Sequence, residues 1–371
     1  MPIKSLYLKN FRNFKHLLLE FDQKVNLIQA PNGAGKTNIL ESIYLSVYGK
    51  SFRPVSTYKD FFHSGLAIES AEYKDVLIKI ERSDFSTQET VINWNNSSFS
   101  KTVYYLNEKT NIKRIYNLYP VILFAPNSVN LVSEDPSGRR DDLDQYLSIH
   151  ISGYSRVLNS YNQSLKNRNT LLKSIREGIA KQSELEFWDK KIAHENCAIF
   201  ELRREFFNKL NNYGSIYFSR IVVHESLKDK SFSVVYKPSV QPKAGVEYSK
   251  LILQKFLENR EKEIKAGTTL YGVHRDDYTF LVDDFDLRYI GSRGQQRVAA
   301  FIFKIIQISY LINENNIHPV FLVDDILSEL DARNKEILIS IIKDLETQTI
   351  ITSPGGVGTD LFDNFRLINL S

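Results

Sequence analysis

The segment Ala30–Thr37, which reads Ala-Pro-Asn-Gly-Ala-Gly-Lys-Thr, constrains the fold of this chain more than any other segment. An apolar run at Val25–Gln29 precedes it, and Asn38–Tyr48 follows it with apolar residues at helical spacing. A strand, a glycine-rich loop and a helix in this order are the context of a phosphate-binding loop. Its two glycines let the backbone curl so that N–H groups point inward. The sequence therefore predicts an α/β fold with a site for nucleotide phosphates.

Each part of the loop has an expected role in holding ATP and Mg²⁺. Lys36 would reach the β- and γ-phosphates, and Thr37 would bind the metal. The N-terminus of the following helix adds a partial positive charge. Alanine replaces the first glycine of the usual G-x-x-x-x-G-K-[ST] pattern, where it needs only an ordinary backbone shape. The expected nucleotide-binding residues of the loop are Ala30, Pro31, Asn32, Gly33, Ala34, Gly35, Lys36 and Thr37.

A second apolar run, Val320–Val323, ends in two acids, Asp324 and Asp325. The carboxyl end of a buried strand places Asp324 at the sheet edge beside the loop. We expect Asp324 to contact Mg²⁺ through water, and Asp325 to face the γ-phosphate and position the attacking water. Lys36 and Asp324 are 288 positions apart. A large insertion must therefore split one ATPase domain, and the two ends of the chain must pair to form it.

The pattern between the two motifs is mainly helical. We divide the chain into an N-terminal part of the head at 1–135, an inserted arm at 136–265, and a C-terminal part of the head at 266–371. Within the arm, helical spacing predicts one long helix from Ser137 to Arg176 and a second from about Glu184 to Tyr217, which would lie antiparallel. Further segments are expected as a charged helix at Tyr248–Lys265, strands at Thr279–Val282 and Leu287–Ile290, and an apolar helix at Gln295–Asn313.

The run Gly291–Arg297 precedes that apolar helix and reads Gly-Ser-Arg-Gly-Gln-Gln-Arg. Small residues and a hydroxyl at a helix start form another anion site. Because one subunit already has its own phosphate loop, the second anion site is best used on the ATP of another subunit. ATP would then join two copies of the chain.

Composition sets broad limits. The net charge of +4 and the pI near 8.8 are compatible with nucleic-acid contact but do not by themselves argue for it. The single cysteine, Cys197, can form no internal disulfide and excludes a four-cysteine metal site. The N-terminus lacks a signal-peptide pattern, and no apolar run reaches the ~18 residues of a membrane span. We expect a reduced, cytoplasmic protein with no membrane contact.

Six further segments match a known pattern, namely Leu8–Phe14, Gly49–Arg53, Leu165–Leu172, Gly272–Asp277, Ser292–Arg297 and Asp324–Asp331. Together they resemble the RecF family of bacterial recombination mediator ATPases, and the resemblance extends from residue 6 to residue 352. The resemblance implies an ABC-type ATPase head with an inserted helical arm, similar to the heads of break-repair and chromosome-structuring ATPases. It also implies an ATP-dependent homodimer that binds single-stranded, gapped or duplex DNA. Such proteins act with RecO- and RecR-like partners to load recombinase, in DNA repair, replication and the SOS response.

The resemblance also assigns roles to residues. Ser292, Gly294, Gln295, Gln296 and Arg297 become the signature that contacts the ATP of the partner, and Asp331 lies in the loop that crosses the dimer interface. Arg12 and Arg53 become further nucleotide contacts. The expected DNA contacts are basic residues of the arm and of the top of the head, namely Arg139, Arg140, Lys166, Arg168 and Lys173.

Three positions depart from related patterns. Val273 stands where the family usually has proline, and Asp325 and Thr352 stand where transporter ATPases have glutamate and histidine. The shorter reach of Asp325 predicts weak ATP hydrolysis at most. An ATP-binding structural protein of chromosomes, with little hydrolysis, is the alternative that stays open.

Other nucleotide-binding classes fit less well. A transporter subunit would not need the long insertion, and a metabolic kinase does not explain the Ser292–Arg297 run. A chromosome-structuring ATPase would carry a coiled coil of hundreds of residues, and its hook-bearing relatives need a Cys-x-x-Cys pair. An overcoming-lysogenization-type nuclease would need a further acidic domain.

Overall fold

The computed structural model describes residues 1–55, 57–63, 75–94, 98–221, 231–325, 332–354 and 365–370. It divides into two compact units, one made of residues 1–128 with 303–371 and one made of residues 129–302. The first unit is assembled from both ends of the chain, as the distance between the two motifs predicted. The second unit contains the predicted arm and extends to residue 302, because strand β10 (Asp277–Val282) pairs with strand β9 (Phe232–Lys237).

A parallel sheet forms the centre of the first unit. Its order in the described part of the chain is β14-β3-β13-β12-β8, and neighbouring strands pair in parallel. Two of its strands come from the N-terminal region and three from the C-terminal region, so neither end could form the sheet alone. The strands are β3 (Val25–Gln29), β8 (Val121–Phe124), β12 (Val320–Val323), β13 (Thr349–Ser353) and β14 (Arg366–Asn369).

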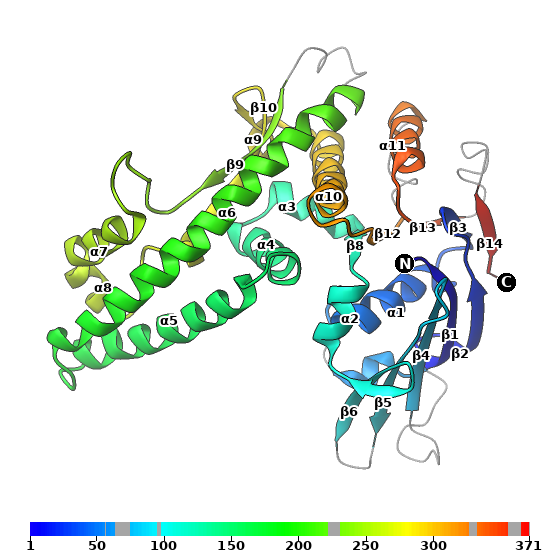
Figure 1. The fold of residues 1–371 in the computed structure, drawn as a ribbon, viewed down its shortest axis with the longest axis horizontal. Helices are drawn as coiled ribbons and strands as arrows, with labels where there is room; N and C mark the ends of the chain where they lie inside the picture. The colour runs from blue at the N-terminus through cyan, green and yellow to red at the C-terminus, as the bar shows by residue number, and fades with distance from the viewer. Residues whose placement is uncertain are drawn as a thin grey trace. The chain divides into compact units, whose positions relative to one another are not determined.

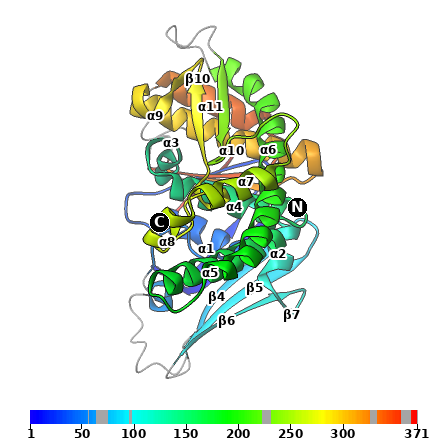
Figure 2. The same ribbon diagram turned by 90° about the vertical axis from the view of Figure 1, so that its left-hand side faces the viewer.

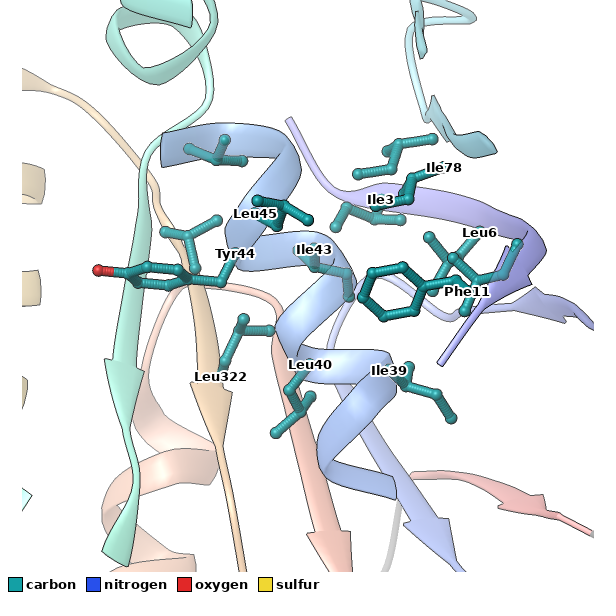
Figure 3. Close-up of a cluster of buried hydrophobic side chains, with 14 of the residues drawn as sticks. Ile3, Leu6, Phe11, Ile39, Leu40, Ile43, Tyr44, Leu45, Ile78 and Leu322 are labelled. Carbon is teal, nitrogen blue, oxygen red and sulfur yellow. The ribbon is translucent and has the colours of Figure 1, made fainter. Parts of the chain in front are cut away.

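An antiparallel sheet of order β2-β1-β4-β5-β6-β7 belongs to the same unit. Helix α1 (Lys36–Tyr48) packs between the two sheets, and its apolar side chains lie between β1 residues such as Phe11 on one side and Leu322 of β12 on the other (Figure 3). The remaining elements are β1 (Ile3–Phe11), β2 (Phe14–Glu20), β4 (Asp75–Arg82), β5 (Thr87–Trp94), β6 (Phe99–Tyr105), β7 (Glu108–Thr110), α2 (Ile112–Leu118) and α11 (Ala332–Asp344).

The second unit is mainly helical. Helices α5 (Tyr154–Arg176) and α6 (Leu185–Ile221) run side by side as the predicted arm (Figures 1 and 2). The other elements are α3 (Asn130–Ser133), α4 (Pro136–His150), α7 (Tyr248–Glu258), α8 (Arg260–Ala266), β9, β10, β11 (Phe285–Asp286) and α9 (Leu287–Ile290). Helix α10 (Arg293–Asn315) starts in this unit and continues into the first.

Three expectations about local structure are wrong. The predicted helix from Ser137 to Arg176 is two helices, because Gly153 takes a left-handed conformation at φ 81°. The predicted helix at Tyr248–Lys265 is also divided, at Asn259. The predicted strand Leu287–Ile290 is helix α9, since the Asp286 side chain accepts a hydrogen bond from the backbone N–H of Arg288 and caps it. Among the described residues, no helix combines the length and the apolar character needed to cross a membrane.

Candidate nucleotide site and its relatives

The phosphate-binding loop sits between β3 and α1, and its shape depends on two glycines. Gly33 and Gly35 have φ values of 86° and 96°, which favour glycine. A Cβ atom on Gly35 would lie 2.4 Å from the side-chain nitrogen of Asn13, so a larger residue would have to displace that side chain and adopt a strained backbone. Lys36 folds back over the loop and donates hydrogen bonds from Nζ to the carbonyl oxygens of Ala30 at 2.6 Å and Pro31 at 3.0 Å.

The acids at the end of β12 meet the start of α1. Thr37 donates a hydrogen bond from Oγ1 to Oδ1 of Asp324 at 3.0 Å, and Thr352 donates to the same oxygen at 2.7 Å. The backbone N–H of Asp325 donates to Thr352 Oγ1 at 3.0 Å. Burial raises the pKa of Asp324, against the opposing hydrogen bonds from Thr352 and Thr37. The structure thus brings Thr37, Asp324 and Asp325 together, and Thr352 connects the two acids.

The donor set at this point suits Mg²⁺. A threonine hydroxyl and a carboxylate are hard oxygen ligands, which is the class that Mg²⁺ prefers. Among the described residues, no group of three His, Cys, Asp or Glu side chains gathers elsewhere as a metal site. A small number of protein oxygens is the usual arrangement for a metal that also binds nucleotide phosphates.

Arg12 and Arg53 share a buried partner that the sequence interpretation missed. Glu41 of α1 is fully buried and accepts hydrogen bonds from Arg12 Nε at 3.0 Å, Arg12 Nη2 at 2.6 Å and Ser51 Oγ at 2.6 Å. Arg53 pairs with the same carboxylate and also donates to Asn38 Oδ1 at 2.6 Å. Burial alone would raise the pKa of Glu41, but these hydrogen bonds hold it below its usual value. The sequence feature that could have identified Glu41 is an acidic residue within a helix that is apolar on most sides.

The signature segment belongs to the second unit. Ser292 and Gln295 bond reciprocally: the Ser292 N–H donates to Gln295 Oε1 at 2.9 Å, and the Gln295 N–H donates to Ser292 Oγ at 3.3 Å. Ser292 and Gly294 are exposed, whereas Gln296 is buried and donates to the carbonyl of Leu287 at 3.0 Å. The predicted interface residue Asp331 lies outside the described residues.

The expected DNA contacts separate into two groups. Lys166 and Lys173 are exposed on α5, and Arg140 is half-buried with a hydrogen bond to the carbonyl of Asp276 at 3.0 Å. Arg139 and Arg168 are buried and paired with carboxylates, so their expected exposure on a basic surface is wrong. Arg168 donates to Asp189 at 2.8 Å, Glu263 at 2.7 Å and Thr269 at 2.8 Å. Its fully buried guanidinium group is therefore not available to DNA.

Sequence comparison identifies the relatives of this chain. A family model described as the RecF/RecN/SMC N terminal domain matches residues 2–357. The DNA replication and repair protein RecF of Clostridioides difficile (strain 630) is 33% identical over 378 residues, which cover 100% of this chain and 96% of the relative. The chain belongs to the RecF family. RecF of Clostridium beijerinckii is 32% identical and covers 100% of this chain and 97% of its own length.

Solved structures agree with that membership. A structure of the recombination mediator protein RecF with ATP, in the RecFOR pathway, superposes with a TM-score of 0.81 at 30% identity, covering 98% of this chain and 94% of that one. An Smc head bound to the C-terminal winged-helix domain of ScpA superposes with a TM-score of 0.58 at 15% identity, covering 98% and 93%, and shows a shared fold. The fold is an ABC-type ATPase head formed by both chain ends, with an inserted helical arm, as the RecF resemblance implied.

Proposed function

We propose that this protein binds ATP and Mg²⁺ at Ala30–Thr37 and acts as an ATP-controlled DNA-binding protein in recombinational repair and replication. The observation that carries the proposal is the hydrogen bond between Thr37 and Asp324, which joins the phosphate-binding loop to the acid strand. Support also comes from the RecF structure with ATP. That protein is a recombination mediator of the RecFOR pathway, and we extend that role to this chain with RecO- and RecR-like partners.

Each residue of the site has a proposed task. Lys36 leaves the two carbonyls that it now contacts and binds the β- and γ-phosphates, while Thr37 and Asp324 hold Mg²⁺. The metal supplies positive charge that neutralises the phosphate oxygens. Arg12 and Arg53, kept in place by Glu41, contribute further nucleotide contacts. Asp325 orients the attacking water, and its short side chain makes hydrolysis weak.

ATP joins two copies of the chain in this proposal. Ser292, Gly294, Gln295 and Arg297 contact the ATP of the partner, Gln296 supports them from inside, and Asp331 belongs to the crossing loop. The exposed apolar side chains of Tyr289 and Ile290, at 79% and 60% exposure, stand directly before this segment and favour an interface there.

The proposed DNA contacts are the exposed Lys166 and Lys173 and the half-buried Arg140. We propose single-stranded, gapped and duplex DNA as ligands, held mainly through phosphates. The buried Arg139 and Arg168 are removed from this set, because charge-assisted bonds already hold their guanidinium groups.

Sedimentation with ATP and with ADP tests the scheme. We expect a dimer with ATP alone, which Lys36→Arg and Ser292→Arg each abolish, while Lys113→Arg on exposed α2 leaves it intact. A monomer under all conditions would remove the central mechanism.

The alternative, an ATP-binding structural protein, is favoured by the short carboxylate of Asp325. It requires the same dimer with little hydrolysis, so measuring whether the dimer dissociates as its ATP is hydrolysed separates the two functions.

A further inference from the structure

The motif Gly272–Asp277 takes no direct part in the proposed nucleotide site, yet its side chains contact α4, α6, α9 and β9 of the second unit. It ends in two acids, Asp276 and Asp277, at the start of β10. Successive side chains of a strand point to opposite faces. The two carboxylates accordingly meet different partners, and the motif becomes a junction between two parts of the unit.

Asp276 faces the arm. Its carboxylate accepts hydrogen bonds from Arg203 of α6 at 3.4 Å and from the backbone N–H of Ser239 at 2.7 Å, and it also accepts one from the hydroxyl of Tyr236 on β9. Arg203 continues the connection, since it donates to Asp144 of α4 at 2.7 Å. Asp276 and Arg203 are both buried, which makes each bond costly to lose.

Asp277 faces the signature segment. Arg139 of α4 holds it through two parallel bonds, from Nε to Oδ1 at 2.6 Å and from Nη2 to Oδ2 at 3.0 Å. Arg288 of α9 donates to the same Oδ2 at 3.2 Å. Burial alone would raise the pKa of Asp277, but Arg139 and Arg288 keep it below its usual value, so the carboxylate stays charged at neutral pH.

Helix α9 is in turn fixed to the start of α10. The side-chain amide of Gln296 donates to the carbonyl of Leu287 at 3.0 Å, and the N–H of Gly291 donates to the same carbonyl at 3.1 Å. A Cβ atom on Gly291 would lie 2.6 Å from that oxygen, so the short α9 and the start of the long α10 meet at a closely packed corner. Ser292 and Gly294, which the proposed function uses, stand on this corner.

We infer that Asp277 and Arg288 are positioning residues for the signature segment, and that they transmit the state of the arm to it through Asp276. The inference rests on the proposed ATP-joined dimer and deepens it by naming how the second anion site is regulated. A change in the arm that moves α6 would reach Ser292 through Arg203, the Asp276–Asp277 pair and Arg288, in that order.

Two mild variants test this path at its two ends. Arg288→Gln removes the bond to Asp277 from a partly exposed side chain, and Tyr236→Phe removes one hydroxyl from the Asp276 side. Arg204→Gln on α6 is the control, because that exposed arginine contacts its helix neighbours Glu201 and Phe200 and has no hydrogen bond to Asp276, Asp277 or Arg288 among the described residues. Neither test residue contacts the phosphate-binding loop, so ATP affinity of the monomer should be unchanged.

The first measurement is amide hydrogen exchange over Leu287–Arg297 in the nucleotide-free full chain. We expect about tenfold faster exchange with Arg288→Gln and about threefold with Tyr236→Phe, and no change with Arg204→Gln, while the melting temperature moves little. The second measurement is the dissociation constant of the dimer with ATP. It should increase by similar factors, because the dimer becomes weaker.

The double variant decides the question. Because Arg288→Gln already interrupts the path, adding Tyr236→Phe should cause no further change in either measurement. Factors that multiply would show two independent effects and overturn the inference, as would unchanged exchange in Tyr236→Phe. If the unaltered protein stays monomeric with ATP, the proposed function fails, and hydrogen exchange alone still decides whether the path exists.

Discussion

Thr37 and Asp324 are joined by a hydrogen bond of 3.0 Å between Oγ1 and Oδ1, although 287 positions separate them in the chain. Thr352 donates to the same carboxylate oxygen, so one acid links α1, β12 and β13. The oxygens that would hold Mg²⁺ therefore lie side by side at the junction of these three elements.

Asp324→Asn tests that relationship. The amide keeps the shape of the side chain but loses the negative charge that a divalent cation requires. Mg²⁺ should increase ATP affinity at least tenfold less in the variant than in the unaltered protein. ATP affinity measured in EDTA should be nearly the same in both. Titration calorimetry with and without Mg²⁺ measures both values. An equal Mg²⁺ effect in Asp324→Asn and the unaltered protein would place the metal elsewhere.

Arg168→Met tests the reassignment of a predicted DNA contact to the interior. The change removes Arg168 from the buried Glu263 and leaves Asp189 paired with Arg260, which should lower the free energy of unfolding by about 3–5 kcal/mol. Burial already raises the pKa of Glu263, so part of the loss should be relieved below neutral pH. Urea unfolding measures the change, and Lys166→Met on the same helix should have little effect. Normal stability in Arg168→Met would argue against the buried role.

His150 predicts how stability responds to acid. Burial lowers its pKa from 6.5 to about 3, and among the described residues its Nε2 atom has no hydrogen-bond partner. Between these values the unfolded chain binds a proton that the folded chain does not, so stability is full above pH 6.5 and falls as pH decreases toward 3. His150 thereby lowers the free energy of unfolding by ~1.4 kcal/mol for each pH unit of decrease within this range.

His150→Leu should remove that contribution and leave stability at pH 7 within about 1.5 kcal/mol of the original. Urea unfolding at pH 7 and pH 5 measures the difference. His274, whose pKa burial lowers to about 4, retains its own share of the acid sensitivity and serves as an internal reference. An unaltered pH slope in His150→Leu would mean that His150 is protonated in the folded protein.

Lys166 and Lys173 test the proposed DNA surface. Each phosphate contact that is lost should reduce the slope of log affinity against log salt by about 1. We therefore expect the double Gln variant to bind gapped DNA more weakly at low salt and with a slope smaller by about 2. Fluorescence anisotropy across a salt series measures both, with Lys113→Gln as control. An unchanged slope would exclude these two lysines as contacts.

The nucleotide site could be predicted because its signals are local. Glycines between a strand and a helix, and acids after an apolar run, depend on a few adjacent residues, and the strands around Lys36 and Asp324 follow the prediction. The pairing of the two chain ends also followed, because both halves of one site must meet.

The burial of Arg168 could not be read from the sequence. Its partners Asp189 and Glu263 are 21 and 95 positions away, and only the packing of α5 against α6 and α8 brings them together. The same holds for Glu41, whose role depends on Arg12 and Arg53 arriving from two different segments. Long-range ion pairs of this kind leave no periodic pattern in the chain.

The parallel sheet has a consequence for how the protein is made. In the described part of the chain, β3 pairs with β13 and β14, which begin at Thr349 and Arg366. The ribosome therefore releases the phosphate-binding loop long before its supporting strands exist. A nascent or prematurely terminated chain carries the loop but has no finished sheet to hold it. Competence to bind nucleotide is thus acquired only after the strands that begin at Thr349 and Arg366 have been synthesised.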